Sequence, residues 1–274
     1  MKMQESFLKI GDDYLFFRSN EMLPNRETLL FVHGLGESGL CFQEVFEDKR
    51  FNNYNVLVPD LIGYGRSSNS ETGNYNFDSH VFRLSKLIES YQINNIILIG
   101  HSMGGDITTL LCKEDREGLI KKYVNIEGDI TQFDIFISNQ AVKAYEENRF
   151  NEWFYDEFIN SEIYESFGKN YRSCRRYHAS LYFCRAETFL SNAQELLKRN
   201  TSLEGQYKSE IGSFYCDIEI SKVYCYGTKS LSDETVDFLK INNLNAKAFN
   251  DAFHWLMIDK AEEFYDFLFS YISK

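Results

Sequence analysis

Apolar side chains occur along this chain in short runs that are separated by amphipathic stretches. Short runs rich in β-branched and aromatic residues are typical of buried strands. The sequence predicts such strands at 14–18, 28–32, 55–60, 96–99, 122–126, 222–226 and 245–249. Helical spacing lies between several of them: Val81, Leu84 and Ile88 recur at three- and four-residue steps after a predicted N-cap at Asp78. Strands that alternate with helices predict the α/β class, with a mostly parallel sheet flanked by helices.

The alternation stops between about 131 and 206. Aromatic clusters such as Trp153-Phe154-Tyr155 indicate helices there rather than a disordered linker. We therefore predict a helical lid, 131–206, inserted after the strand that ends near Ile126, and a core made of 1–130 and 207–274. Most of the lid aromatics are expected to pack the lid onto the core, and the rest to line an apolar pocket. The lid arginines either face solvent or face a substrate carboxylate.

The strand at 96–99 leads into Gly100-His101-Ser102-Met103-Gly104-Gly105, and helical spacing resumes directly afterwards. The chain must turn sharply at Ser102, which strains its backbone and brings neighbouring backbones close. Side chains at Gly100 and Gly104 would obstruct that turn. The pattern is G-x-S-x-G, a nucleophile elbow that raises a serine hydroxyl above the sheet edge at a helix N-terminus.

A serine hydroxyl is a poor nucleophile until a base removes its proton, and histidine is the usual base. Of the five histidines, His254 alone follows the last predicted strand. Loops after parallel strands converge on one edge of the sheet, so His254 can meet Ser102 there. His33 and His101 lie inside glycine motifs, where packing or local hydrogen bonding is expected.

Composition narrows the possible partners. The chain has 29 lysines and arginines against 41 acids, a net charge of −12, which argues against nucleic acid as the main partner. Six scattered cysteines form no zinc-site spacing, and no phosphate-loop or dinucleotide fingerprint is present, so we expect no metal and no cofactor. No apolar run reaches the roughly 18 residues of a membrane span, and the first residues do not read as a signal peptide. A cytoplasmic protein is the expectation.

Several motifs together resemble the α/β-hydrolase fold superfamily, in its serine-nucleophile, esterase- and lipase-like branch. They are His33-Gly34, Asp60 with Gly63-x-Gly65-x-Ser67, the elbow at 100–105, and His254-Trp255, in that order, within a resemblance that runs from about residue 14 to the end. The resemblance implies that Ser102 is the nucleophile and that His254 is the general base and then the acid. It also implies an oxyanion hole formed by the backbone amides of Leu35 and Met103, which suits the need for preorganised donors.

The orienting acid departs from the family pattern. The usual position, just beyond the strand at 222–226, holds Ser230, which cannot carry the negative charge. Some superfamily members take the acid from the strand after the nucleophile helix, where this chain has Glu127. We rank Glu127 first because a carboxylate at the end of a buried strand is hard to explain as solvated surface. Asp233, which could instead cap a helix, comes second, and Asp129 third.

The resulting hypothesis is a serine hydrolase that cleaves a small, largely apolar carboxylic ester or related acyl compound through an acyl-enzyme. A carbon–carbon bond hydrolase or lyase on the same triad is the alternative. A ligand-binding protein that retains the pocket without turnover is a third hypothesis, supported only by the displaced acid. The sequence leaves the oligomeric state open.

Overall fold

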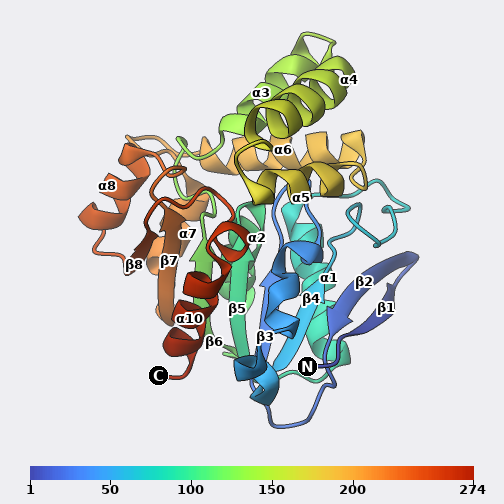
Figure 1. Ribbon diagram of the computed structural model, residues 1–274, viewed down its shortest axis with the longest axis vertical. Helices are drawn as coiled ribbons and strands as arrows, with labels where there is room; N and C mark the ends of the chain where they lie inside the picture. The colour runs from blue at the N-terminus through green and yellow to red at the C-terminus, as the bar shows by residue number, and fades with distance from the viewer.

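The computed structural model describes residues 1–274. One eight-stranded sheet runs in the order β1-β2-β4-β3-β5-β6-β7-β8 (Figure 1). The strands are β1 (Gln4–Ile10), β2 (Asp13–Ser19), β3 (Thr28–Val32), β4 (Asn55–Pro59), β5 (Ile96–His101), β6 (Ile120–Ile126), β7 (Ser221–Gly227) and β8 (Ala246–Phe249). All neighbours from β4 to β8 are parallel, while β1 and β2 form an antiparallel edge. This architecture confirms the predicted α/β class and mostly parallel sheet.

The register of the parallel strands brings their carboxyl ends together. Val32 at the end of β3 is paired with Gly100 of β5, and His101 of β5 with Ile126 at the end of β6. Ile126 is in turn paired with Cys225 of β7, and Gly227 with Phe249 of β8. The loops that follow these five strands therefore leave the sheet side by side at one edge.

Helices follow most of the strands. They are α1 (Phe77–Ser90), α2 (Met103–Glu114), α3 (Phe136–Glu146), α4 (Phe150–Glu152), α5 (Arg172–Leu181), α6 (Ala186–Asn200), α7 (Glu210–Asp217), α8 (Asp233–Ile241), α9 (Leu256–Asp259) and α10 (Ala261–Ile272). Two 3₁₀-helices, η1 (Gly39–Phe46) and η2 (Lys49–Asn53), and a π-helix, η3 (Trp153–Phe167), complete the set. α1 and α2 pack together on one face of the sheet, and α10 covers the opposite face (Figure 1).

The start of α1 differs from the prediction. Its N-cap is Asn76, whose side-chain oxygen accepts a hydrogen bond from the Ser79 amide at 2.8 Å. The predicted cap, Asp78, is instead in the first turn, where its negative charge lies near the positive end of the helix dipole. The prediction at Asp78 is therefore wrong by two positions, because both residue types are favourable at a helix start.

The chain between β6 and β7 forms the helices α3, α4, η3, α5 and α6, which gather at one end of the molecule (Figure 1), followed by α7. Their buried aromatics pack on one another: the Trp153 and Phe158 rings stack at 5.0 Å, and those of Phe154 and Phe189 lie 4.9 Å apart. These side chains belong to the same contiguous apolar cluster as the sheet. Other aromatics of this segment point outward, and Phe183 is 70% exposed.

No helix combines the length and the apolar character that crossing a membrane requires. All six cysteines are free thiols, and Cys41, Cys174, Cys184 and Cys225 are buried.

Candidate active site

Ser102 occupies the turn between β5 and α2. Its backbone has φ 52° and ψ −130°, the strained left-handed geometry expected for this turn. The flanking glycines are required sterically: a Cβ at Gly100 would lie 2.3 Å from the Thr108 hydroxyl, and one at Gly104 would lie 2.2 Å from a β3 carbonyl oxygen. The turn places the Ser102 side chain on the wall of a cavity of about 260 Å³.

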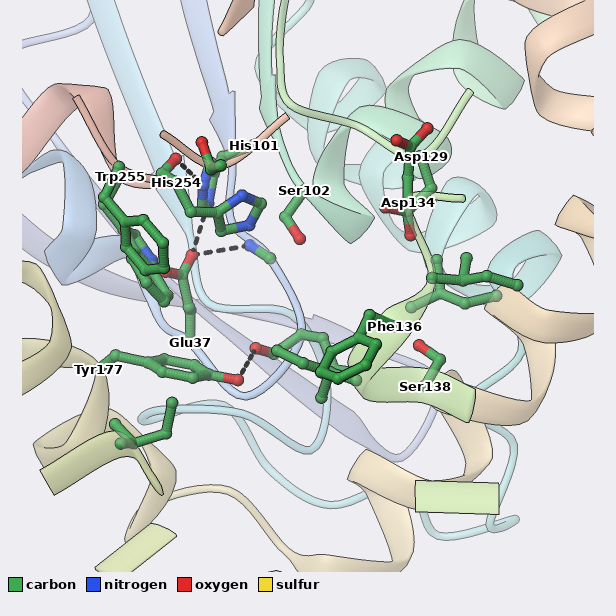
Figure 2. A pocket seen from close by; sticks show the side chains of 18 of the residues that line it. Glu37, His101, Ser102, Asp129, Asp134, Phe136, Ser138, Tyr177, His254 and Trp255 are labelled. Atoms are coloured by element: carbon green, nitrogen blue, oxygen red, sulfur yellow. Dashed lines mark hydrogen bonds and ion pairs between the residues drawn. The ribbon is translucent and has the colours of Figure 1, made fainter. Parts of the chain in front are cut away.

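His254 reaches the same cavity from the loop between β8 and α9. Figure 2 shows its imidazole beside Ser102, although no hydrogen bond joins the two side chains. His254 Nδ1 lies 2.7 Å from Glu127 Oε2, which leaves Nε2 as the nitrogen available for a serine proton. Burial by itself would lower the pKa of His254, but the hydrogen bond to Glu127 and the charge of that carboxylate outweigh it and raise the pKa.

Glu127 lies directly after β6, with a left-handed backbone at φ 48°. Its second oxygen, Oε1, accepts hydrogen bonds from the Gly227 amide and the Ser230 hydroxyl, both at 2.6 Å. Ser230, the residue at the family's usual acid position, therefore holds the carboxylate that a neighbouring strand supplies. Of the alternative acids, Asp233 is the first residue of α8, and neither Asp233 nor Asp129 bonds to His254.

Leu35 and Met103, the predicted oxyanion-hole residues, flank Ser102 from two elements. Met103 is the first residue of α2, so its amide has no acceptor within the helix. Leu35 lies in the loop after β3 and lines the cavity. That loop is fixed from both sides: the Gly34 amide donates to Glu37 Oε2 at 2.9 Å, and the Tyr177 hydroxyl of α5 donates to the Leu35 carbonyl at 2.9 Å (Figure 2).

Glu37 and His101 form a buried pair that sequence reasoning missed. His101 Nδ1 lies 3.0 Å from Glu37 Oε2, and its Nε2 lies 3.1 Å from the backbone oxygen of His254. Both partners are acceptors only, so both contacts are hydrogen bonds when each ring nitrogen carries a proton. His101 thus links two distant loops instead of bonding locally, whereas His33 does bond locally, to the Gly34 carbonyl.

The charge of Glu37 is strongly stabilised. Burial would raise the pKa of this carboxyl, but the charge of His101 and hydrogen bonds from His101, the Gly34 amide and the Trp255 indole lower it to about 2. The carboxylate consequently ties together the loop that carries Leu35, the β5 end and the segment that carries His254.

The remaining cavity wall is apolar with several acids. Its apolar side chains include Ile135, Phe136, Ile137, Ile163 and Phe253. Asp129, Asp134 and Glu162 also line it, together with one lysine, Lys229. None of the arginines between β6 and β7 does; Arg176, for example, lies 2.7 Å from Glu44. No group of three or more histidine, cysteine, aspartate or glutamate side chains is placed to hold a metal ion.

Known proteins resemble the chain in sequence over limited segments. An uncharacterised hydrolase of Bacillus subtilis (strain 168), YugF, is 34% identical over 85 residues, 31% of each chain. Lipase 3 of Moraxella sp. (strain TA144) is 30% identical over 105 residues, 38% of this chain and 32% of the lipase. The matched segments thus span about a third of the length of these curated relatives.

Solved structures resemble the chain over nearly its whole length. A structure from work on carboxylesterases of Nitrososphaera gargenis has a TM-score of 0.76 at 16% identity and covers 98% of both chains. The esterase EaEST of Exiguobacterium antarcticum has a TM-score of 0.73 at 16% identity, covering 99% of this chain and 100% of its own. At such identities the likeness shows the fold. The family profile described as alpha/beta hydrolase fold matches residues 27–261, and the chain therefore belongs to the alpha/beta hydrolase fold family.

Proposed function

We propose that this protein is a serine hydrolase that cleaves small carboxylic esters, with Ser102 as nucleophile, His254 as base and Glu127 as the orienting acid. The observation that carries the proposal is the 2.7 Å contact between His254 Nδ1 and Glu127 Oε2, beside a serine held at φ 52°. A carboxylate at Nδ1 fixes the imidazole tautomer whose Nε2 accepts a proton, and it stabilises the imidazolium that forms. The lipase and esterase names among the relatives support the reaction class.

In the proposed reaction the Ser102 hydroxyl gives its proton to His254 Nε2 while Oγ attacks the ester carbonyl carbon. The carbonyl π electrons move to oxygen, and the resulting oxyanion accepts hydrogen bonds from the Leu35 and Met103 amides. Loss of one such donor typically costs about 3–4 kcal/mol of transition-state stabilisation. The C–O bond then breaks, and the leaving alkoxide takes the proton from His254. Water repeats the sequence on the acyl-enzyme and releases the acid.

The helices between β6 and β7 act in this proposal as a lid that completes the substrate cavity. Phe136 of α3, Ile163 of η3 and Tyr177 of α5 all line the cavity that holds Ser102. Their apolar surface favours a substrate whose body is largely hydrocarbon. Ordering of Leu35 by the Tyr177 hydroxyl couples the placement of the lid to the oxyanion loop.

The test is turnover of p-nitrophenyl esters of increasing chain length by the wild type and by Ser102→Ala, Glu127→Gln and Asp233→Asn. We expect Ser102→Ala to abolish turnover and Glu127→Gln to lower kcat by about 10³- to 10⁴-fold, because an amide cannot stabilise the imidazolium. Asp233→Asn is the matched control and should stay near wild type, since Asp233 only begins α8.

Loss of activity in Asp233→Asn with a near-normal Glu127→Gln would overturn the assignment of the acid. Covalent labelling of Ser102 by a fluorophosphonate, with no turnover of esters, thioesters or lactones, would instead favour carbon–carbon bond cleavage on the same residues.

A further inference from the structure

We propose that the part of the cavity around Asp129 binds a positively charged organic group on the acyl portion of the substrate. This inference rests on the proposed function, because the places of the acyl portion and the leaving group in the cavity are deduced from Ser102 as nucleophile and His254 as base. It adds a charged anchor to a cavity whose other walls favour hydrocarbon.

Asp129 is a buried acid without a partner. The residue is 6% exposed and lines the cavity, and its backbone amide donates to Asp106 Oδ1 at 2.9 Å. Its carboxyl group, however, makes no hydrogen bond with the protein, whereas buried polar groups are nearly always paired. A ligand group that enters the cavity would supply the missing partner.

The acids around Asp129 favour a cation as that partner. Burial and the nearby carboxylates of Asp106, Asp134 and Glu127 all raise the pKa of Asp129, and no basic residue opposes them. Two of these neighbours are already occupied: Asp134 accepts hydrogen bonds from the Thr131 amide and the Thr235 hydroxyl, and Glu127 holds His254. Asp129 is therefore the acid in this group that lacks any donor, and a cation would relieve the crowding of like charges.

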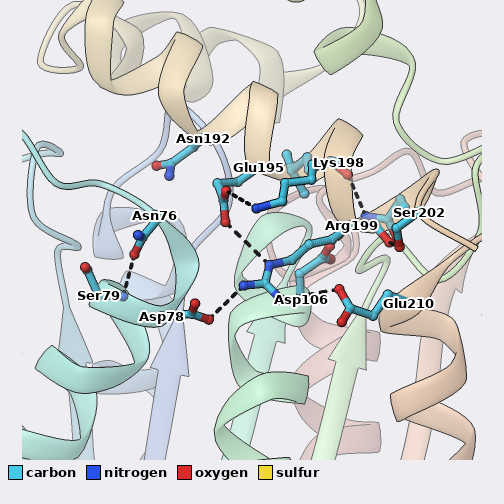
Figure 3. Close-up of polar contacts among 12 residues, drawn as sticks. Asn76, Asp78, Ser79, Asp106, Asn192, Glu195, Lys198, Arg199, Ser202 and Glu210 are labelled. Carbon is cyan, nitrogen blue, oxygen red and sulfur yellow. Dashed lines mark hydrogen bonds and ion pairs between the residues drawn. The ribbon is translucent and has the colours of Figure 1, made fainter.

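Arg199, whose charge acts on the neighbouring carboxyl group of Asp106, does not supply that countercharge. Arg199 of α6 lies 2.7 Å from Asp78, 3.5 Å from Glu195 and 3.4 Å from Glu210 (Figure 3). The Arg199 guanidinium is thus already paired with three other carboxylates. Lys229, the lysine of the cavity wall, lies 3.1 Å from Asp251. The acidic side chains do not converge as a metal-ligand set, so the ligand we propose is an organic ammonium group.

The position of Asp129 indicates that the charged group belongs to the acyl portion of the substrate and not to the leaving group. In Figure 2 Asp129 lies across Ser102 from His254. The leaving group must lie within reach of His254, which returns a proton to it. The acyl portion then extends to the other side of Ser102, toward Asp129.

The test uses two esters that differ in charge but hardly in shape: p-nitrophenyl 4-(trimethylammonio)butyrate and its carbon analogue, p-nitrophenyl 5,5-dimethylhexanoate. The measured quantity is the ratio of kcat/KM for the cationic ester to that for the neutral ester. Intrinsic ester reactivity cancels when this ratio is compared between the wild type and Asp129→Asn. We expect the ratio to fall on the order of tenfold to a hundredfold in Asp129→Asn, the range for an interaction with a charged group.

Glu165→Gln is the matched control, because Glu165 is an exposed acid of η3 outside the cavity. It removes the same charge from the molecule and should leave the ratio unchanged. An unchanged ratio in Asp129→Asn would overturn the inference. Asp129→Asn is expected to fold, since it removes a charge that its neighbours repel, and an unfolding midpoint at or above that of the wild type would support this view of the cluster.

Binding separates this inference from the proposed function. Calorimetric titration of Ser102→Ala with the ethyl esters of the same two acids measures recognition without turnover. Tighter binding of the cationic ester, lost in the Ser102→Ala/Asp129→Asn double variant, would support the inference even if the wild type hydrolysed neither ester. Equal binding of the two ethyl esters would overturn it even if hydrolysis were observed.

Discussion

Replacing Glu37 by glutamine keeps the size of a buried side chain and removes its charge. Glu37 is 3% exposed and accepts hydrogen bonds from the Gly34 amide, His101 and the Trp255 indole. A glutamine can satisfy at most part of this set, and it leaves the His101 ring without its counterion. We expect Glu37→Gln to lower both the stability of the fold and the order of the loops around Ser102.

The size of the stability loss follows from the pKa of Glu37, which lies at about 2 in the folded protein against an ordinary value of 4.5. Each tenfold change in proton affinity is worth about 1.4 kcal/mol, so folding stabilises the ionised carboxylate by about 3 kcal/mol. Because the folded pKa is the lower one, this contribution is present above pH 4.5 and is lost as the pH falls toward 2. The variant lacks this part of the pH dependence.

Urea unfolding of the wild type and Glu37→Gln at a series of pH values measures both quantities. We expect a difference of about 3 kcal/mol near pH 7 that shrinks as the pH falls below 4.5. Glu147→Gln, at an exposed acid that pairs with Arg149, serves as control and should leave the unfolding midpoint unchanged. A Glu37→Gln variant as stable as the wild type near pH 7, or a difference that persists undiminished at low pH, would refute the assignment of a stabilising buried charge.

Two further predictions concern catalysis. His254 must be neutral to act as a base, and its pKa lies above the ordinary 6.5, so kcat/KM should rise with pH through a midpoint above 6.5. Glu127→Gln removes the carboxylate that raises this pKa and should move the midpoint to lower pH. A midpoint that stays in place in Glu127→Gln would contradict this prediction. Tyr177→Phe removes the donor to the buried Leu35 carbonyl and should lower kcat about tenfold with little change in KM for a short ester. Tyr182→Phe, at an exposed tyrosine of the same segment, should have no such effect, and equal losses in both variants would speak against a specific role for Tyr177.

The central strands of the sheet were predictable from the sequence because they are buried. β3 has the predicted bounds, Thr28–Val32, and all five of its residues are buried, so the apolar run and the strand coincide. β1, Gln4–Ile10, has no buried residue and pairs only with β2, so its sequence carries no apolar run for a pattern to detect. The π-helix η3 escapes an α-helical pattern for a different reason. Its buried residues recur every five positions, at 153, 158 and 163 and at 154 and 159, instead of at the three- and four-residue steps of an α-helix.

The residues of the candidate site that a short sequence segment identifies were predictable. The contacts between residues that lie far apart in the sequence were not. The glycines around Ser102 and the place of His254 after the last strand are features of short segments. The partnership of Glu37 with His101 joins residues 64 positions apart, and nothing in either segment predicts it. Ser230 read in the sequence as a departure from the family pattern, and only the fold reveals that its hydroxyl lies 2.6 Å from Glu127.

The contacts between α5 and the loop that carries His254 bear on how a substrate enters. The Tyr177 ring lies 4.9 Å from that of Trp255, and the Tyr171 ring stacks on that of Phe253 at 4.7 Å. Aromatic side chains of α5 and of the residue before it therefore pack against both sequence neighbours of His254. Swinging α5 away would expose Tyr177 and Trp255, each 4% exposed at present, at a cost of roughly 1.5–3 kcal/mol per side chain. A wide-open form would then account for fewer than about one molecule in a hundred. Esters should therefore reach Ser102 through movements of individual side chains while α5 stays in place. For esters with bulky acyl groups, slow entry into the cavity should then limit turnover even where the cavity could hold the acyl group.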